Sequence, residues 1–467
     1  MAESARNIIQ KIWDQHVVAE LDGGQCLLQV DRVVLHDRAG PAVFGPLQES
    51  GRSVAHPSMV FGTMDHIVDT NAGRNDDTLF KGGRAFIQAF RSGAMAAGIT
   101  MFDMGDPRQG ISHVISPEQG IALPGATLVC CDSHTCTIGG IGALAWGIGT
   151  SEGEHAVATQ TLVRTRPPTM RVTFTGRLSP GVTAKDMALA LIGRYGATGG
   201  AGHAIEFCGE AVRALDVEAR LTLCNMAVEF GAWTGLVAPD QTTFDWLSGR
   251  PYAPHGDQWD VAVGHWRALA SDAEAAWDRE LTLDCTQLAP QVSWGTNPGQ
   301  VAGVDDAVPF GVADAERALE YMDMQPGQLL AGVPVDAAFI GSCTNSRLSD
   351  LRAAAAVAKG RHVAAGVTAI VVPGSTAVKL AAEAEGLDAI FKAAGFEWRE
   401  SGCSLCFYVG GDSFDRPGRP ARRVISSTNR NFEGRQGPGV RTHLASPATV
   451  AASALAGCIA DPRPLLA

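Results

Sequence analysis

The most constraining feature of this sequence is a repeated order of strand-like run, turn and helix. Residues 126–130 and 335–340 are short apolar runs, each followed by a Gly, Ser or Thr turn and then by an Ala-rich segment. Residues 369–372 repeat the pattern, with a turn at 373–375 and a helical segment through 377–384. This alternation is typical of an α/β fold. Open α/β sheets bind ligands at the carboxyl ends of their strands, so motifs at those ends are the first candidates for a site.

The length of 467 residues is typical of about three domains. Residues 164–168 break one helical pattern before a β-rich run at 170–174, and a second boundary lies near 283–290. We therefore expect three α/β domains, at 1–167, 168–287 and 288–467.

Composition narrows the class of protein. The hydrophobic fraction of 46% can supply sizeable cores, yet no uninterrupted apolar run is long enough to span a bilayer. The N-terminal residues lack the basic and apolar order of a secretory signal, and eleven scattered cysteines favour a reducing compartment, so we expect a cytoplasmic protein. The formal net charge of −12 argues against bulk nucleic-acid binding, and an anionic substrate would need local positive charge.

Three cysteines carry the strongest chemical signal. Cys343 lies in the segment Gly-Ser-Cys-Thr-Asn-Ser, and Cys403 and Cys406 form a C-x-x-C pair. The adjacent Gly341 and Gly402 would let backbone N–H groups approach an anionic cluster closely. A lone C-x-x-C also occurs in zinc and thiol-redox sites, and a single cysteine is often an inert buried thiol. On these residues alone, the alternatives stay open.

A second group combines histidines with carboxylates. Its members are Asp65, His66, His113, the Asp132-Ser133-His134 motif and Glu229. A histidine held by a carboxylate is a suitable proton donor near neutral pH, although a structural role is the common alternative for any one of them. His36 beside Asp37 is a weaker case of the same pattern.

Two arginines, Arg430 and Arg435, flank the segment Asn-Phe-Glu-Gly. Their planar guanidinium groups can bind carboxylates in a bidentate manner, which lysines cannot do. Ordinary surface arginines are the alternative.

Several segments occur in one order along the chain: CDSHT (131–135), GALAWGIGTSE (142–152), CNMAVEFGA (224–232), LVAPDQTTF (236–244), WGTNPGQV (294–301), GSCTNSR (341–347) and NRNFEGRQG (429–437). Together they closely resemble the aconitase superfamily, and most closely its isopropylmalate dehydratase family. The resemblance spans nearly the whole chain.

This resemblance implies a three-domain α/β core around one [4Fe-4S] cluster per chain. Its ligands would be Cys343, Cys403 and Cys406, which leaves one iron open to bind a substrate hydroxyl as a Lewis acid. Cys130, Cys131 and Cys136, which adjoin the Asp132-Ser133-His134 motif, do not match the family's ligands.

The resemblance also assigns roles to the other residues. It pairs His66 with Asp65, His113 with Asp132 and His134 with Glu229, and makes His66 the proton donor to the leaving hydroxide. The implied substrate-binding residues are Arg430, Arg435, Ser133, Asn225 and Asn429.

The implied reaction is a reversible dehydration and rehydration that interconverts 2-isopropylmalate and 3-isopropylmalate in leucine biosynthesis. In aconitases, a serine of a small swivelling domain removes the substrate proton. No counterpart of that serine loop is recognisable before Ala467. We therefore expect a separate small subunit in a heterodimer, a small di- or tricarboxylate substrate, and no nucleic-acid or membrane partner.

Some residues depart from the family pattern. Residues 407–412 read Phe-Tyr-Val-Gly-Gly-Asp, and Cys136 and Ile138 stand where smaller or more polar residues are usual. Another substrate, such as citramalate, dimethylmalate or homoaconitate, therefore stays open. Two further alternatives are a zinc hydrolase that uses the three cysteines and an RNA-binding regulator, which the acidic balance disfavours.

Overall fold

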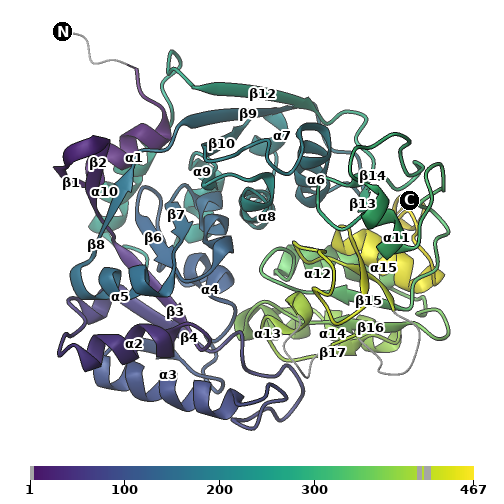
Figure 1. Ribbon diagram of the computed structural model, residues 1–467, viewed down its shortest axis with the longest axis horizontal. Helices are drawn as coiled ribbons and strands as arrows, with labels where there is room; N and C mark the ends of the chain where they lie inside the picture. The colour runs from purple at the N-terminus through teal and green to yellow at the C-terminus, as the bar shows by residue number, and fades with distance from the viewer. Residues whose placement is uncertain (1–4, 408–412, 415–421, 467) are drawn as a thin grey trace. The chain divides into compact units, whose positions relative to one another are not determined.

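The computed structural model describes residues 5–407, 413–414 and 422–466 (Figure 1). The chain forms two compact units, each assembled from separated segments. The first unit comprises Met1–Asp65, Arg84–Thr175 and Gly200–Leu283. The second comprises His66–Gly83, Gly176–Gly199 and Asp284–Ala467.

A five-stranded parallel sheet forms the largest sheet of the first unit. Its strand order is β5 (Thr100–Phe102), β4 (Val60–Thr63), β3 (Arg32–His36), β6 (Thr127–Cys130) and β7 (Leu144–Gly147). Every residue of β4 and β6 is buried, as expected for parallel strands that are covered on both faces.

Two smaller sheets complete the first unit. One has the order β11 (Thr234–Leu236), β10 (Ala204–Cys208), β9 (Thr169–Thr175) and β12 (Arg279–Asp284), and the other has the order β1 (Val17–Glu20), β2 (Gln25–Gln29) and β8 (Thr161–Thr165). The helices of this unit are α1 (Ile8–His16), α2 (Gly40–Glu49), α3 (Gly83–Ala97), α4 (Ser112–Glu118), α5 (Thr150–Thr159), α7 (Glu210–Arg213), α8 (Val217–Asn225), α9 (Gln241–Leu247) and α10 (Asp257–Arg267).

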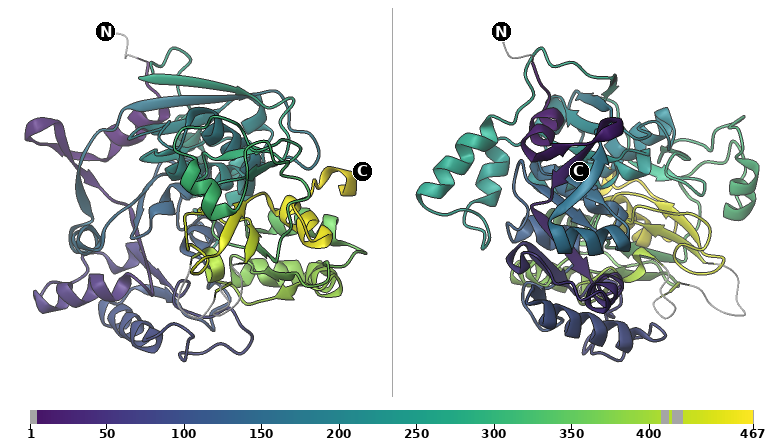
Figure 2. Two further views of the ribbon diagram at one scale, coloured as in Figure 1. Left: turned by 45° about the vertical axis from the view of Figure 1, so that its right-hand side comes forward. Right: turned by 60° about the vertical axis from the view of Figure 1, so that its left-hand side comes forward.

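The second unit is built on another five-stranded parallel sheet. Its order is β17 (Glu397–Trp398), β16 (Thr368–Val371), β15 (Ala337–Ile340), β18 (Arg423–Ser426) and β19 (Arg441–Leu444). In Figure 2, the yellow C-terminal strands of this sheet lie beside its green strands. A short antiparallel pair, β13 (Gln291–Ser293) and β14 (Val301–Gly303), belongs to the same unit.

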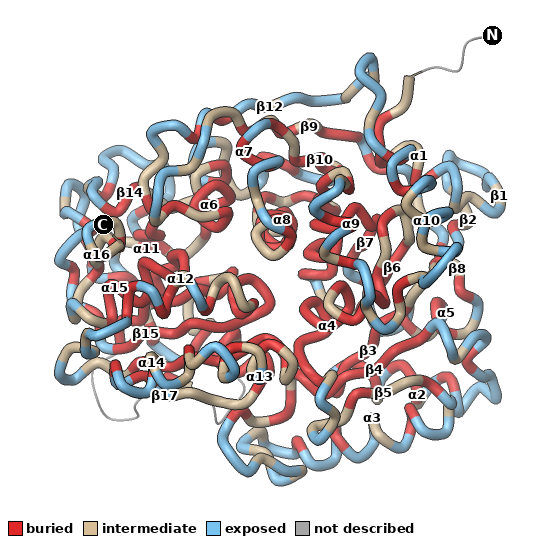
Figure 3. Tube along the Cα trace, turned by 180° about the vertical axis from the view of Figure 1, so that it is seen from behind, coloured by how far each residue is buried: buried red, intermediate tan, exposed pale blue. Residues whose placement is uncertain are grey.

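The helices of the second unit are α6 (Ala184–Tyr195), α11 (Glu316–Met322), α12 (Leu348–Ala358), α13 (Thr376–Ala384), α14 (Leu387–Ala393), α15 (Pro447–Ala456) and α16 (Arg463–Leu466). Helix α15 packs on strands β15 and β18, and α12 packs on α15. Figure 3 shows β15 and α15 in the red of buried residues, which identifies this layer as the core of the unit.

The C-x-x-C segment is attached to this core by one of the two residues between its cysteines. Leu405 is buried in one apolar cluster with Phe339 of β15, Ile370 of β16 and Val424 of β18. Burial of a leucine side chain stabilises a fold by about 1.5–3 kcal/mol, so the packing of Leu405 restrains the cysteines on either side of it.

The strand and helix predictions at 126–130, 335–340, 369–372 and 377–384 are confirmed by β6, β15, β16 and α13, and so is the α/β fold class. Each of the three larger sheets lies within one of the three predicted domain segments, while the boundaries of those segments stay a prediction. Among the residues that the structure describes, no helix is long and apolar enough to cross a membrane.

Candidate functional site

Two loops of the second unit bring the predicted cysteine ligands to one edge of its sheet, and a third loop brings Asn429 to the same edge. Cys343 follows β15, Cys403 and Cys406 follow β17, and Asn429 follows β18. The strands are parallel, so their carboxyl ends share an edge. All three cysteines are buried, and all eleven cysteines of the chain are free thiols.

Polar side chains link the two cysteine loops and the Asn429 segment. The amide nitrogen of Asn429 lies 3.6 Å from the Cys343 sulfur, and its amide oxygen accepts from the Cys406 thiol at 3.9 Å. The Ser342 hydroxyl lies 3.2 Å from the Cys406 sulfur and 3.9 Å from the Cys343 sulfur. The loops therefore form one group of sulfur, hydroxyl and amide groups. The three cysteines with Ser342 and Asn429 are called the cysteine pocket below.

The backbone beside two of the cysteines adopts an uncommon conformation. Ser342 has a φ of 81° and Ser404 a φ of 46°, both in the left-handed region that favours glycine. Each such residue costs about 1–2 kcal/mol, and strain of this kind concentrates at functional sites. Gly341 meets a different requirement, because a Cβ there would lie 2.6 Å from the Phe339 ring.

Two further predicted residues lie beside these cysteines. His66 places its Nδ1 3.8 Å from the Cys403 sulfur. A guanidinium nitrogen of Arg435 lies 3.7 Å from the Cys406 sulfur, and the group stacks over Phe407 at 5.3 Å and Phe432 at 5.4 Å. Arg430, the residue after Asn429, is partly buried. The pocket thus carries positive charge next to its sulfurs.

A second group of predicted residues lies in the first unit. His113 Nε2 is 3.0 Å from Asp132 Oδ1, and the same oxygen accepts the backbone N–H of His134 at 2.7 Å. His134 Nε2 is 2.8 Å from Glu229 Oε1. The two carboxylates thus hold the two imidazoles in defined orientations.

Close packing of a glycine explains how Glu229 reaches His134. The 3-10 helix η3 (Ser133–Ile141) packs against α8, and a Cβ on Gly140 would lie 2.6 Å from the backbone nitrogen of Leu221 in α8. Only glycine permits this approach. The end of α8 and the following segment are thereby held beside the Asp132-Ser133-His134 motif.

The remaining predicted residues of the first unit have defined contacts. Ser133 is exposed, with its hydroxyl 3.4 Å from His134 Nδ1. Asn225 is buried and donates to the Thr137 hydroxyl at 2.7 Å. Asp65 is buried and accepts the backbone N–H of Ser112 at 2.9 Å. The pairing of Asp65 with His66 stays a prediction, as do the catalytic and binding roles of all these residues.

The cysteines near the histidine motif have the properties of structural thiols. Burial, with the carboxylates of Asp132 and Glu152, raises the pKa of the Cys131 thiol to about 12. Cys130 is fully buried in β6, and the Cys136 thiol donates to the carbonyl of Asn225 at 3.7 Å. A thiolate is the form that binds metals, so a high pKa disfavours Cys131 as a ligand.

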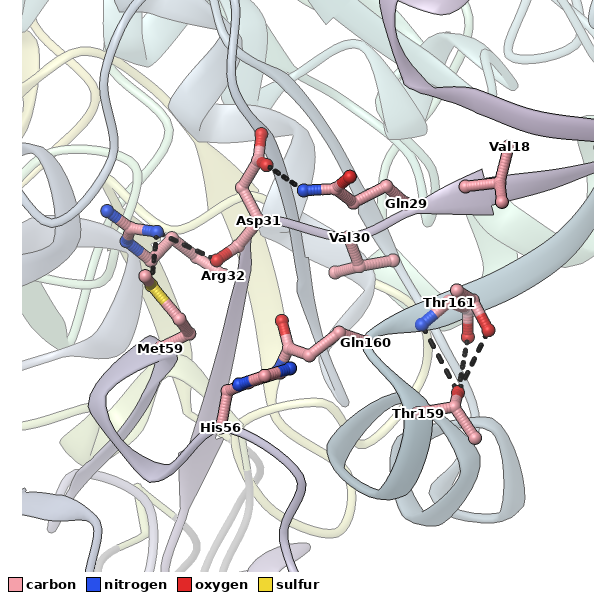
Figure 4. A pocket seen from close by; sticks show the side chains of 10 residues that line it. All are labelled: Val18, Gln29, Val30, Asp31, Arg32, His56, Met59, Thr159, Gln160 and Thr161. Atoms are coloured by element: carbon pink, nitrogen blue, oxygen red, sulfur yellow. Dashed lines mark hydrogen bonds between the residues drawn. The ribbon is translucent and has the colours of Figure 1, made fainter.

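A separate surface pocket of about 350 Å³ lies in the first unit (Figure 4). Arg32 lines it and donates to the carbonyl of Asp31 at 2.8 Å, and His56 and Gln160 are among its other lining residues. None of the predicted site residues lines this pocket. It is therefore distinct from both groups described above.

Sequence reasoning missed two polar residues of the cysteine pocket. Ser342 was not singled out, because its left-handed backbone leaves no trace in the sequence. Lys185 reads as an ordinary charged residue in the first turn of a helix, yet it is fully buried. The substrate-related departures at 408–412 lie outside the described residues.

Comparisons with known proteins identify the family of this chain. Residues 10–457 match the aconitase family (aconitate hydratase), so the chain belongs to that family. The chain is 54% identical over 466 residues to the 3-isopropylmalate dehydratase large subunit 1 of Bradyrhizobium diazoefficiens, with coverage of 98% of this chain and 96% of that relative. The predicted resemblance is confirmed, and family membership identifies a hydro-lyase.

The cysteine pocket fits the iron–sulfur cluster that the family implies. All three cysteines are buried, Cys343 and Cys406 share polar neighbours, and a guanidinium beside Cys406 can offset negative charge on its sulfur. Hydrogen bonds to cysteine sulfurs tune such clusters. The donor set is therefore suitable for an iron–sulfur cluster.

The left-handed backbone at Ser404 provides a test of the site's geometry. Glycine adopts this conformation without steric cost, whereas the Cβ of alanine makes it unfavourable. Both replacements lose the 3.1 Å contact of the Ser404 hydroxyl with Thr70. We expect Ser404→Gly to be more stable than Ser404→Ala by roughly 0.5–1 kcal/mol in urea unfolding.

Ala389 in α14 serves as the control, because Ala389→Gly should instead destabilise an ordinary helical position by about 0.5–1 kcal/mol. A Ser404→Ala variant at least as stable as Ser404→Gly would contradict the left-handed geometry.

Proposed function

We propose that this chain is the large catalytic subunit of a [4Fe-4S] hydro-lyase that interconverts 2-isopropylmalate and 3-isopropylmalate. The observation that carries the proposal is the group of three buried cysteines at one edge of the sheet, in which Asn429 and Ser342 bridge the sulfurs of Cys343 and Cys406. The name of the relative, 3-isopropylmalate dehydratase large subunit 1, supports the substrate and a place in leucine biosynthesis. The free cysteines are consistent with a cytoplasmic location.

The cluster would be held by Cys343, Cys403 and Cys406. With these three cysteines as its protein ligands, the cluster would supply Lewis-acid chemistry to a substrate oxygen. Ser342 and Asn429 would restrain the sulfurs of Cys343 and Cys406.

The chain's own side chains would bind substrate and move protons. Arg435 and Arg430 are proposed to bind substrate carboxylates, and the stacking of Arg435 on Phe407 and Phe432 limits the rotation of its guanidinium. His66, beside the Cys403 sulfur, is the proposed donor of a proton to the leaving hydroxide.

The other proposed residues would orient the histidine rings and supply further protons. Asp132 and Glu229 fix the ring orientations of His113 and His134. Ser133, Asn225 and Asp65 complete the proposed set, with Ser133 as the exposed hydroxyl of the motif.

Replacement of Cys403 tests the proposed cofactor. Cys403→Ser removes one thiolate ligand and should abolish the broad visible absorption of the cluster together with its bound iron and acid-labile sulfide. Cys136→Ser is the matched control, because it removes another buried thiol and should leave all three signals unchanged. Stoichiometric zinc in the anaerobically purified parent, or full iron in Cys403→Ser, would contradict the proposal.

A small subunit that carries the base for the substrate C–H bond is the proposed partner. Stabilising a leaving hydroxide is of little use unless a proton departs from the adjacent carbon. We expect the cluster-loaded chain to be nearly inactive alone on 2- and 3-isopropylmalate.

Activity should appear on titration with the small subunit and saturate at about one partner per chain. Parallel assays with citramalate, dimethylmalate and homoaconitate would identify another preferred substrate. Full activity without a partner would mean that the base lies within this chain.

A further inference from the structure

Lys185 is a fully buried lysine that no role described above uses. It lies in the first turn of α6, and its ammonium group donates to the carbonyl of Ser427 at 3.0 Å and to the carbonyl of Thr428. Within the described part of the chain, these are its polar contacts, and it forms no ion pair.

The neighbouring Asp186 does not neutralise this charge by direct contact. One oxygen of its carboxylate accepts the backbone N–H and the hydroxyl of Thr183 at 2.8 and 2.9 Å, and the other accepts the N–H of Gln291 at 2.8 Å. Burial raises the pKa of Asp186 to about 6. Asp186 therefore caps the helix, and the ammonium of Lys185 binds the carbonyls of Ser427 and Thr428 instead.

Burying an ammonium group costs several kcal/mol unless negative charge compensates for it. Burial lowers the pKa of Lys185 to about 8, while Asp350, Asp186 and the sulfurs of Cys343 and Cys406 act in the opposite direction. The side chain is thus cationic at neutral pH, and the sulfurs of two cysteines lie within range of its charge.

The carbonyls that Lys185 binds belong to the segment that reaches the cysteines. Thr428 precedes Asn429, whose amide contacts the sulfurs of Cys343 and Cys406. The Ser427 hydroxyl accepts the N–H of Gly341 at 3.0 Å, close to Cys343 along the chain. A change at Lys185 would consequently be transmitted to both cysteine loops.

We propose that Lys185 is a positioning residue of the cysteine pocket, which anchors the Asn429 segment and supplies the buried positive charge that offsets the negative charge of the cluster. This inference rests on the proposed cluster. A cluster held by three thiolates is anionic and becomes more so on reduction, so a nearby cation stabilises the reduced form. Lys185 therefore raises the reduction potential of the cluster.

Two variants separate charge from anchoring. Lys185→Gln removes the charge and keeps an N–H donor, whereas Lys185→Met removes both. Lys392→Met is the matched control, because Lys392 is an exposed lysine of α14 in the same unit, paired with Asp388 at 2.8 Å. The readout is the reduction potential of the cluster-loaded full chain, from a dithionite titration monitored by electron paramagnetic resonance.

We expect Lys185→Gln to lower the ratio of reduced to oxidised cluster at a fixed potential about tenfold, which is about 59 mV for a one-electron couple. Lys392→Met should match the parent. Lys185→Met should in addition lose iron faster, at unchanged circular dichroism. If Lys185→Met does not fold, Lys185→Gln still tests the charge.

The outcomes distinguish this inference from the proposed function. A parent chain that binds zinc or no metal overturns both. A parent with a full cluster and a Lys185→Gln potential equal to that of the parent overturns only the role of Lys185. If Lys185 had only a structural role, its replacement would change the midpoint of unfolding and leave the reduction potential of the cluster unchanged.

Discussion

The meeting of three loops at one carboxyl edge of a parallel sheet is the constraint on which the candidate site depends. Strands β15, β17 and β18 run in the same direction, so the segments that carry Cys343, Cys403 and Asn429 leave the sheet on the same side. Leu405 then fixes the C-x-x-C turn to the apolar core. The sheet and its core thereby determine where the sulfurs lie.

Charge is the second physical requirement of this pocket. The chain has a formal net charge of −12, yet a cationic guanidinium lies beside Cys406 and a buried ammonium lies behind the Asn429 segment. Both the cluster of this family and a dicarboxylate substrate are anionic. Under the proposed function, local positive charge in this acidic protein would therefore serve the same pocket twice, once for the cofactor and once for the substrate.

The sequence was sufficient to predict the strands at 126–130, 335–340 and 369–372 and the α/β class, because each leaves a local pattern. Local pattern also singled out the three cysteines, while their role as cluster ligands came from the family resemblance. The contact of His134 with Glu229 came only from the family resemblance. It depends on the close approach of α8 to Gly140, which no local pattern encodes. Lys185 and Asp186 look alike as helix-start charges, and only tertiary packing shows that both are buried. The left-handed backbone at Ser342 is likewise set by its surroundings.

Mössbauer spectroscopy of the chain loaded with iron-57 tests the central claim most directly, because it reports each iron of a cluster separately. With three cysteine ligands, a single iron should shift its spectrum when 2-isopropylmalate is added, while the others stay unchanged. A spectrum in which no iron responds to substrate and all are equivalent would contradict a cluster with an open iron.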